Sequence, residues 1–104
     1  MYEFAWPSPA FGGRLGACHA LEIAFVFDTL DKGPDQMTGP LLGPAPPRQL
    51  ASRMHAAWVS FAAYGDSGWP KYDLSRRATM RFDAMPAVVD DPRSMERALW
   101  SGLR

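Results

Sequence analysis

The sequence is poor in cysteine and has no excess of charge of either sign. Its 104 residues include one cysteine, Cys18, so no disulfide can form within the chain. The 11 basic residues are scattered and are balanced by 11 acidic ones, which argues against binding to nucleic acid or to an anionic membrane. No apolar run approaches the roughly 18 residues that a membrane span needs. The N-terminus also lacks the pattern of a signal peptide, so the cytoplasm is only the default location.

Residues that could carry chemistry are also few. His19, His55 and Cys18 have neither the HxxxH nor the CxxC spacing of a metal site, so neither a metal nor a cofactor is expected. Adjacent side chains generally point apart, and we therefore interpret Cys18 as a small buried thiol and not as a nucleophile activated by His19. His55 is interpreted as a surface or boundary residue. The sequence also lacks the Gly-x-Ser-x-Gly pentapeptide that carries the nucleophile of many hydrolases.

The patterns in the first half of the chain predict a strand followed by loops. Aromatic residues alternate over residues 1–6, which is typical of a short strand. Gly12-Gly13 then predicts a mobile loop that leads to His19. Residues 20–27 are apolar apart from Glu22, and a short helical turn or a buried extended segment would fit equally well. Eight of the seventeen residues in 31–47 are Gly or Pro, which predicts a surface loop.

The second half of the chain contains the clearest helix. Pro46-Pro47 supplies its start, and Gly65 follows its end, where a left-handed cap favours glycine. One apolar stripe recurs at helical spacing between these limits and consists of Leu50, Met54, Ala57, Trp58 and Phe61.

Two short extended pieces and a terminal helix are predicted to follow. The alternation over residues 78–83 indicates a strand, and Val88-Val89 indicates a second one. Asp91-Pro92 predicts a helix with Asp91 as its N-cap, whose apolar side holds Met95, Leu99 and Trp100. The large aromatic residues expected to act as packing anchors are Trp58, Phe61, Trp69 and Trp100.

Several of these segments resemble one family in the same order. The segment His19-Ala20-Leu21-Glu22-Ile23-Ala24-Phe25-Val26-Phe27 is similar to the catalytic-histidine segment of type-B carboxylesterases, the cholinesterase-like branch of the α/β-hydrolases. The strand at 2–6 resembles the strand that precedes that histidine, and 58–65 resembles the helix ending in Phe-Ala-x-x-Gly. Trp69-Pro70-Lys71-Tyr72 matches a Trp-Pro-x-Tyr turn, and residues 90–92 resemble the approach to the last helix. The resemblance covers essentially the whole chain.

This resemblance implies a C-terminal portion, about one fifth, of a carboxylic-ester hydrolase. Residues 1–104 would form a single partial α/β domain with an incomplete sheet, an exposed apolar face and a tendency to self-associate. His19 would be the general base of a Ser-Glu/Asp-His triad, whose serine and oxyanion loop would lie upstream. Glu22 would support the histidine loop, although a triad acid and a solvated side chain remain alternatives. Because Met1 falls inside the strand motif, a truncated, split or mis-started gene product, or a cut piece, is expected.

The expected partners are the missing N-terminal part of the hydrolase or a second copy, and the substrate of the complete enzyme would be a small carboxylic ester. The chain is not expected to be active alone. The alternative is a non-catalytic remnant or partner module that binds through its exposed apolar face.

A competing motif, Gly65-Asp66-Ser67-Gly68-Trp69-Pro70, resembles the nucleophile segment of chymotrypsin-like proteases. Those enzymes need two β-barrels and about twice this length. Here the motif follows a helix, and Trp69 replaces a glycine in crowded geometry. We therefore interpret Ser67 as part of a turn that follows the helix.

Overall fold

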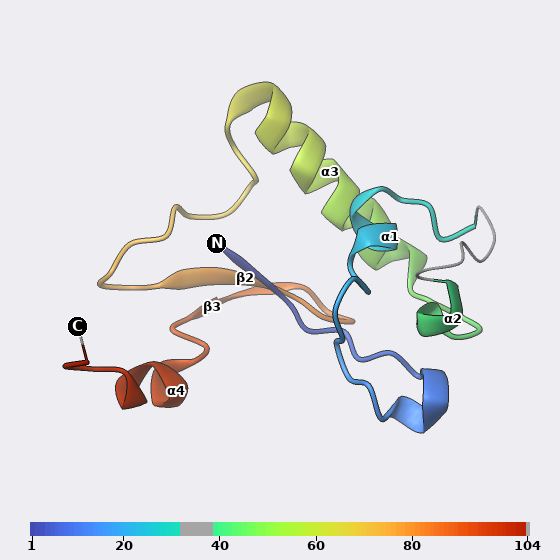
Figure 1. The fold of residues 1–104 in the computed structure, drawn as a ribbon. Helices are drawn as coiled ribbons and strands as arrows, with labels where there is room; N and C mark the ends of the chain where they lie inside the picture. The colour runs from blue at the N-terminus through green and yellow to red at the C-terminus, as the bar shows by residue number, and fades with distance from the viewer. Residues whose placement is uncertain (32–38, 104) are drawn as a thin grey trace.

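The computed structural model describes residues 1–31 and 39–103, and it contains a small sheet, one long helix and several short helices (Figure 1). Its arrangement is the α/β fold with an incomplete sheet that the sequence predicts. In chain order, the elements are β1 (Tyr2–Phe4), the 3-10 helix η1 (Ala10–Gly13), α1 (Ile23–Val26), α2 (Gly39–Leu42), α3 (Arg48–Tyr64), β2 (Ala78–Phe82), β3 (Ala87–Asp90) and α4 (Ser94–Leu99).

The sheet has the strand order β1-β2-β3, so β1 lies at one edge. β1 runs parallel to β2 with Tyr2 opposite Met80, whereas β3 pairs antiparallel with β2 and places Asp90 opposite Ala78. β1 is thus paired along one of its two edges, although the sequence predicts only an incomplete sheet. Local patterns could not reveal this pairing because the two strands lie at opposite ends of the sequence.

The long helix α3 confirms the helix predicted from the apolar stripe. It begins at Arg48, after Pro47 with an extended backbone at ψ 103°, so the proline precedes the first helical position instead of occupying it. At the other end Gly65 has φ 70°, and its N–H donates to the Phe61 carbonyl at 2.8 Å. The glycine thus caps the helix in the left-handed conformation that the sequence indicates.

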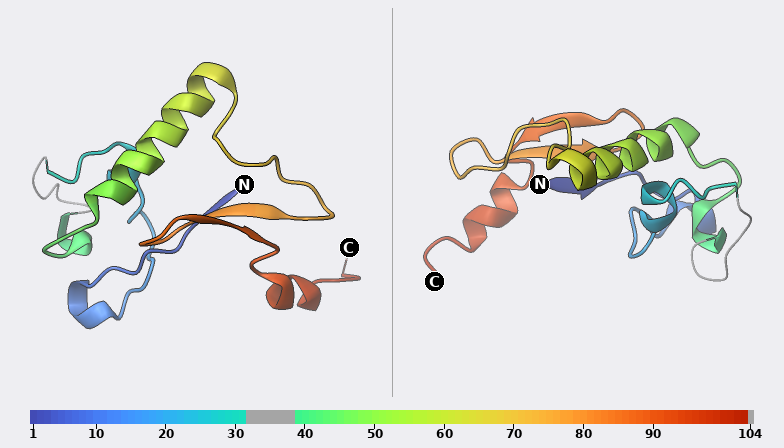
Figure 2. Two further views of the ribbon diagram at one scale, coloured as in Figure 1. Left: turned by 180° about the vertical axis from the view of Figure 1, so that it is seen from behind. Right: turned by 90° about the horizontal axis from the view of Figure 1, so that it is seen from above.

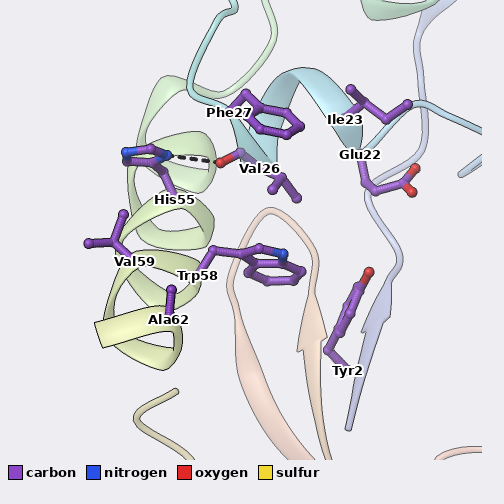
Figure 3. A pocket seen from close by; sticks show the side chains of 9 residues that line it. All are labelled: Tyr2, Glu22, Ile23, Val26, Phe27, His55, Trp58, Val59 and Ala62. Atoms are coloured by element: carbon purple, nitrogen blue, oxygen red, sulfur yellow. Dashed lines mark hydrogen bonds between the residues drawn. The ribbon is translucent and has the colours of Figure 1, made fainter. Parts of the chain in front are cut away.

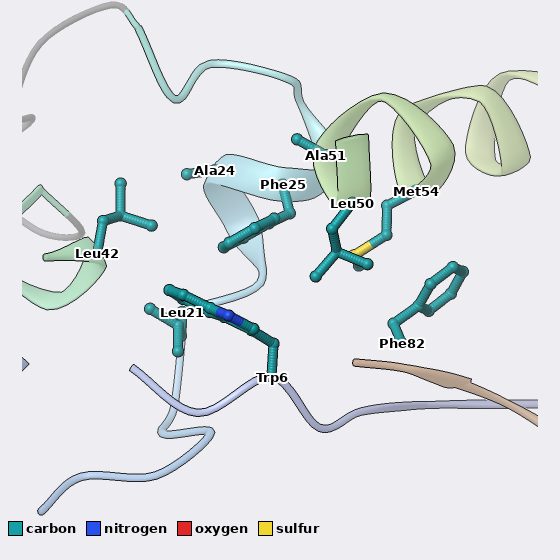
Figure 4. Close-up of a cluster of buried hydrophobic side chains, with 9 residues drawn as sticks. All are labelled: Trp6, Leu21, Ala24, Phe25, Leu42, Leu50, Ala51, Met54 and Phe82. Carbon is teal, nitrogen blue, oxygen red and sulfur yellow. The ribbon is translucent and has the colours of Figure 1, made fainter. Parts of the chain in front are cut away.

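The core lies between the first half of α3, α1 and the sheet (Figure 4). Phe25 is fully buried at its centre, and its ring centroid lies 5.2 Å from those of both Phe4 and Trp6. The first half of α3 therefore covers α1 and the sheet. The buried members of this cluster are Trp6, Leu21, Ala24, Phe25, Leu42, Leu50, Ala51, Met54 and Phe82.

Two of the four expected packing anchors do pack against this core. Trp58 and Trp69 contact it from its rim, and each ring lies within about 6 Å of Phe82, at 6.1 and 5.7 Å. Phe61 and Trp100 remain 61% and 72% exposed, so the prediction is wrong for both. Their burial would require surface that residues 1–31 and 39–103 do not offer.

Three segments outside the long helix contain short helical turns. The residues after Glu22 form α1, which decides between the two conformations that the pattern left open. In the Gly/Pro-rich segment 31–47, residues 39–42 form α2, contrary to expectation, while 32–38 lie outside the described residues. Burial of Leu42 favours this turn in spite of its composition. Gly12-Gly13 likewise ends a 3-10 turn, η1, in which Phe11 and Gly12 have positive φ.

The terminal helix α4 begins later than predicted and packs less. Its N-cap is Arg93, not Asp91, which instead adopts a left-handed φ of 46°. No residue of α4 is buried, and Met95 and Leu99 are exposed. Two viewing directions place α4 at one end of the molecule and the η1, α1 and α2 cluster at the other (Figure 2). Among the described residues, no helix combines the length and hydropathy required to cross a bilayer.

Candidate functional site

The predicted base, His19, lies on the loop between η1 and α1, four residues before the helix begins. Its side chain is exposed, whereas Leu21, two residues later, is fully buried. The loop is closed by short-range bonds in which the Leu21 N–H donates to the Cys18 carbonyl at 3.3 Å and the Ile23 N–H to the Ala20 carbonyl at 3.3 Å. The chain therefore turns tightly around the histidine and presents its imidazole to solvent.

Buried apolar side chains hold this turn from beneath. Leu21 and Phe25 are both fully buried, and Ala24 between them is 3% exposed (Figure 4). At the start of α1, the Glu22 carbonyl accepts the Val26 N–H at 2.9 Å. Because interiors are close-packed, these anchors leave little freedom for the loop backbone. The position of His19 is thus set by the core and not by contacts of its own ring.

The residue after the histidine has a strained backbone. Ala20 has φ 65°, in the left-handed region that costs a residue with a Cβ about 1 kcal/mol or more. This strain could not be predicted from the sequence, because a single alanine carries no sign of a positive φ. Ala20 lies in the turn between His19, which is exposed, and Leu21, which is buried.

His19 borders a hollow of about 320 Å³ beside the open edge of β1. Glu22, which is half-buried, borders the same hollow. Among the described residues, no hydrogen bond joins the two side chains, so the geometry gives Glu22 no direct role in orienting the imidazole. The lining residues are Tyr2, Phe4, Ala17, Cys18, His19, Ala20 and Glu22. Tyr2 and Phe4 were not predicted at the site, although their alternation along the strand already placed them on one face.

A second hollow of about 460 Å³ lies between α1, α3 and β1, and it shares Glu22 with the first (Figure 3). His55 borders it from α3, and its Nδ1 lies 2.9 Å from the Val26 carbonyl at the end of α1. A carbonyl oxygen only accepts, so Nδ1 carries the proton. His55 is exposed, as the sequence predicts, and it joins α3 to α1 on the opposite side of the hollow from Glu22 (Figure 3).

The other candidate residues lie apart from His19. Cys18 is a free, half-buried thiol at the rim of the core, less buried than expected. Ser67 borders different hollows, after α3. There the Gly68 N–H donates to Asp66 Oδ1 at 2.8 Å, as in an ordinary turn. Within residues 1–31 and 39–103, no three metal-ligating side chains cluster.

Known proteins with similar sequences include an esterase and a hydrolase of much greater length. The para-nitrobenzyl esterase of Bacillus subtilis is 33% identical over 102 residues, which cover 93% of this chain and 20% of that protein. The phenmedipham hydrolase of Pseudarthrobacter oxydans is 35% identical over 89 residues, 85% of this chain and 17% of that one. The chain therefore spans about one fifth of the length of these relatives. No protein-family model matches it.

The solved structures that resemble this chain are also esterases, and the chain again covers about one fifth of each. A Geobacillus stearothermophilus carboxylesterase superposes with a TM-score of 0.74 at 38% identity, over 96% of this chain and 21% of that chain. A structure of a PNB esterase superposes with a TM-score of 0.76 at 30% identity, over 94% of this chain and 21% of that one. The similarity in sequence and the similarity in fold thus both extend over nearly the whole of residues 1–104.

Proposed function

Because the chain belongs to the type-B carboxylesterase family of α/β-hydrolases, as part of its C-terminal portion, we propose that it supplies His19 as the general base of an ester hydrolase. The observation that carries the proposal is the exposed imidazole on a loop whose neighbours Leu21 and Phe25 are fully buried. A general base must be held in place and yet be open to the group that it deprotonates. The loop of His19 meets both requirements.

In the proposed reaction, His19 takes the proton of a serine hydroxyl as the serine oxygen attacks the ester carbonyl. The imidazolium then returns this proton to the leaving alkoxide, and the same exchange with water releases the acid. The serine, the oxyanion donors and the triad carboxylate would come from outside residues 1–104. The substrate class is accordingly a small carboxylic ester, and the first partner is the rest of the hydrolase.

Glu22 is proposed to support the histidine loop and not to act as the triad carboxylate. Its backbone carbonyl accepts the first bonds of α1, from the Phe25 and Val26 N–H groups at 3.0 and 2.9 Å. Its half-buried side chain lies between the two hollows and has no bond to His19 among the described residues. Loss of its charge should therefore displace the loop slightly without removing the base.

The proposal is tested in a hybrid esterase, the Bacillus subtilis para-nitrobenzyl esterase in which residues 1–104 replace the matching segment. Hydrolysis of a p-nitrophenyl ester is measured for the hybrid and for its His19→Gln variant. Removal of a triad base should lower kcat by about 10⁴-fold or more. Glu22→Gln should lower it by at most about 10²-fold, the size of a positional error.

His55→Gln is the matched control, because it removes the other histidine and leaves kcat within a few fold. The purified chain alone should show no serine-dependent turnover. If His19→Gln and His55→Gln hybrids hydrolyse the ester equally well, His19 is not the base. A chain that bound the rest of the enzyme without restoring turnover would support the alternative of a non-catalytic module.

A further inference from the structure

A polar hollow of about 300 Å³ lies at the α4 end of the molecule, between β1, the segment that leads into β2, and α4. Its volume is at the lower end of the range for small-molecule pockets. The basic residues Arg77, Arg93 and Arg97 border it, together with the acidic residues Glu3 and Asp91. The side chains that line the hollow therefore carry one more positive charge than negative charges.

Two of the three guanidinium groups are already paired with a carboxylate. Arg97 donates two hydrogen bonds to Asp91, from Nε to Oδ1 at 3.1 Å and from Nη2 to Oδ2 at 2.6 Å. Arg93 donates to Glu3 from Nε at 3.1 Å and also from Nη2. Arg77 is half-buried, and among the described residues no carboxylate lies within ion-pair distance of it. Because a partly buried charge without a counterion is costly, the excess positive charge of the hollow belongs to Arg77.

The side chain of Arg77 has a neutral partner that also borders the hollow. Arg77 Nη1 donates a hydrogen bond to the phenol oxygen of Tyr72 at 3.0 Å. Most N–H donors of the guanidinium remain open after this bond. The Tyr72 hydroxyl has no acceptor of its own within the part of the chain that the structure describes, and the bond from Arg77 polarises it as a donor. An anion in the hollow can therefore accept hydrogen bonds from the guanidinium and from the phenol.

The backbone that carries Arg77 is fixed in a strained conformation. Arg77 has φ 55° and Asp91 has φ 46°, both in the left-handed region that is unfavourable for a residue with a Cβ. The Arg77 carbonyl accepts the Asp91 N–H at 3.3 Å and the Thr79 hydroxyl at 3.0 Å, and the Arg77 N–H donates to the Asp73 carbonyl at 2.9 Å. Such strain persists where the surrounding bonds over-determine the backbone, and it gathers at ligand sites. The guanidinium is thus presented to the hollow from a rigid base.

The charge and the walls of the hollow decide which anion suits it. One unpaired guanidinium balances one negative charge, whereas Glu3 and Asp91 would repel a second. The planar fork of a guanidinium matches the two oxygens of a carboxylate. Met1, Tyr2 and Pro92 add apolar wall, against which an organic group can be buried.

We propose that this hollow binds a small monocarboxylate with an apolar body, whose carboxylate accepts hydrogen bonds from the Arg77 guanidinium and the Tyr72 hydroxyl. The proposal does not depend on the role of His19, because no residue of the histidine loop borders this hollow. Dianions such as phosphate fit less well, since the two carboxylates of the lining face them.

The site is tested with benzoate as the probe, added to the full chain at constant ionic strength. The Nε–Hε NMR signal of Arg77 should shift and saturate, and equilibrium dialysis gives the dissociation constant. Arg77→Gln should weaken binding by about tenfold or more. Arg77→Lys should weaken it by about as much, because an ammonium lacks the planar fork. Arg76→Gln is the matched control and should leave the dissociation constant unchanged, since Arg76 pairs with Asp90 and does not border the hollow.

A second variant keeps the test decisive if the Arg77 variants do not fold. Tyr72→Phe retains the ring and removes only the hydroxyl, so it should weaken benzoate binding by about tenfold while the urea midpoint stays close to that of wild type. Wild-type affinity in a folded Arg77→Gln chain or in Tyr72→Phe would overturn the proposal. So would inorganic phosphate at mildly alkaline pH, where it is a dianion, if it bound as tightly as benzoate.

The same dialysis on the hybrid esterase tests the competing occupant, a segment of the hydrolase outside residues 1–104. Radiolabelled benzoate bound by the hybrid, less that bound by its Arg77→Gln variant, should approach one molecule per chain. If the hybrid binds no more than this variant, another segment fills the hollow and the proposal is overturned. The His19→Gln hybrid should lose turnover and keep this binding, so failure of this proposal and failure of the proposed function are told apart.

Discussion

The two ends of this molecule are held together by different forces. At the end that carries His19, Leu21 and Phe25 are fully buried and pack against α3 (Figure 4). At the other end, α4 has no buried residue and is attached through exposed ion pairs. Arg93 pairs with Glu3 of β1, and Arg97 Nη2 lies 2.6 Å from Asp91 Oδ2.

This contrast between apolar burial and ion pairs indicates which end of the molecule is rigidly held by contacts among residues 1–104. Burial of apolar area is worth about 25 cal/mol per Å² and is not screened by salt, whereas exposed ion pairs contribute little and are screened. The histidine loop is therefore held by apolar packing within residues 1–104. The apolar residues of α4 at Met95, Leu99 and Trp100 stay exposed, so that end has the fewest packing contacts to hold it.

Removal of a core side chain should give the largest effect. Phe25→Ala deletes a fully buried ring and should lower the free energy of unfolding by about 3–5 kcal/mol. Leu99→Ala, an exposed site on α4, should change it by less than about 0.5 kcal/mol. Urea unfolding followed by tryptophan fluorescence measures both. Equal losses at the two sites would mean that the ends are not held differently.

Two left-handed glycines provide the next comparison. A Cβ at Gly43 would lie 2.6 Å from Pro9 Cγ, near the histidine end, whereas a Cβ at Gly65 would meet nothing within 4 Å. Both have φ 70°. Gly65→Ala should therefore cost only backbone strain, about 1 kcal/mol, and Gly43→Ala about 2–3 kcal/mol. Urea midpoints of the two variants in the opposite order would contradict the packing of α2 against η1.

Relief of strain beside the histidine should have a smaller and opposite effect. Ala20→Gly removes the penalty of φ 65° and should raise the free energy of unfolding by up to about 1 kcal/mol. Ala45→Gly is the control, an exposed loop site without a positive φ, where glycine only loosens the unfolded chain. The control should therefore be slightly less stable than wild type in thermal unfolding. If both substitutions destabilise the chain, Ala20 is not strained.

Acid and salt should affect α4 alone, with the smallest effect. The hydrogen bond from Arg97 lowers the pKa of Asp91 below its ordinary value. The pair therefore contributes fully above the usual aspartate pKa of about 3.9 and loses its contribution as the pH falls through the lower folded-state value. The protection of the α4 amides, relative to the exchange rate of an unstructured chain at the same pH, should fall below about pH 4 or in 1 M salt, before that of the α1 amides. If α4 and α1 lose protection under the same conditions, the two ends are not held by different interactions.

The sequence predicted those parts of the fold that depend on local patterns. The apolar stripe and Gly65 located α3, and alternation located β2, because helical and strand periods leave a direct trace in the sequence. The pairing of β1 with β2 and the turn at α2 were missed, since each depends on contacts between distant residues. The prediction that Asp91 is the N-cap of the last helix was wrong because its carboxylate pairs with Arg97.

For the candidate site, the sequence supplied residue types but not their environment. The motif identified His19 and Glu22, and both side chains border one hollow in the structure. The strained Ala20 and the lining residues Tyr2 and Phe4 were not foreseen. Backbone strain leaves no trace in a single alanine. The lining of a hollow is decided by how the strand and the loop pack together.

Chemical rescue distinguishes a base at position 19 from a merely structural histidine, and we propose that His19 is the base. In the hybrid esterase, His19→Ala should lower kcat by about 10⁴-fold and leave room beside the hollow of about 320 Å³. Added imidazole should then restore turnover in a saturable manner, after hydrolysis by imidazole alone is subtracted. If imidazole does not restore turnover although the hybrid is folded, His19 does not act as the base.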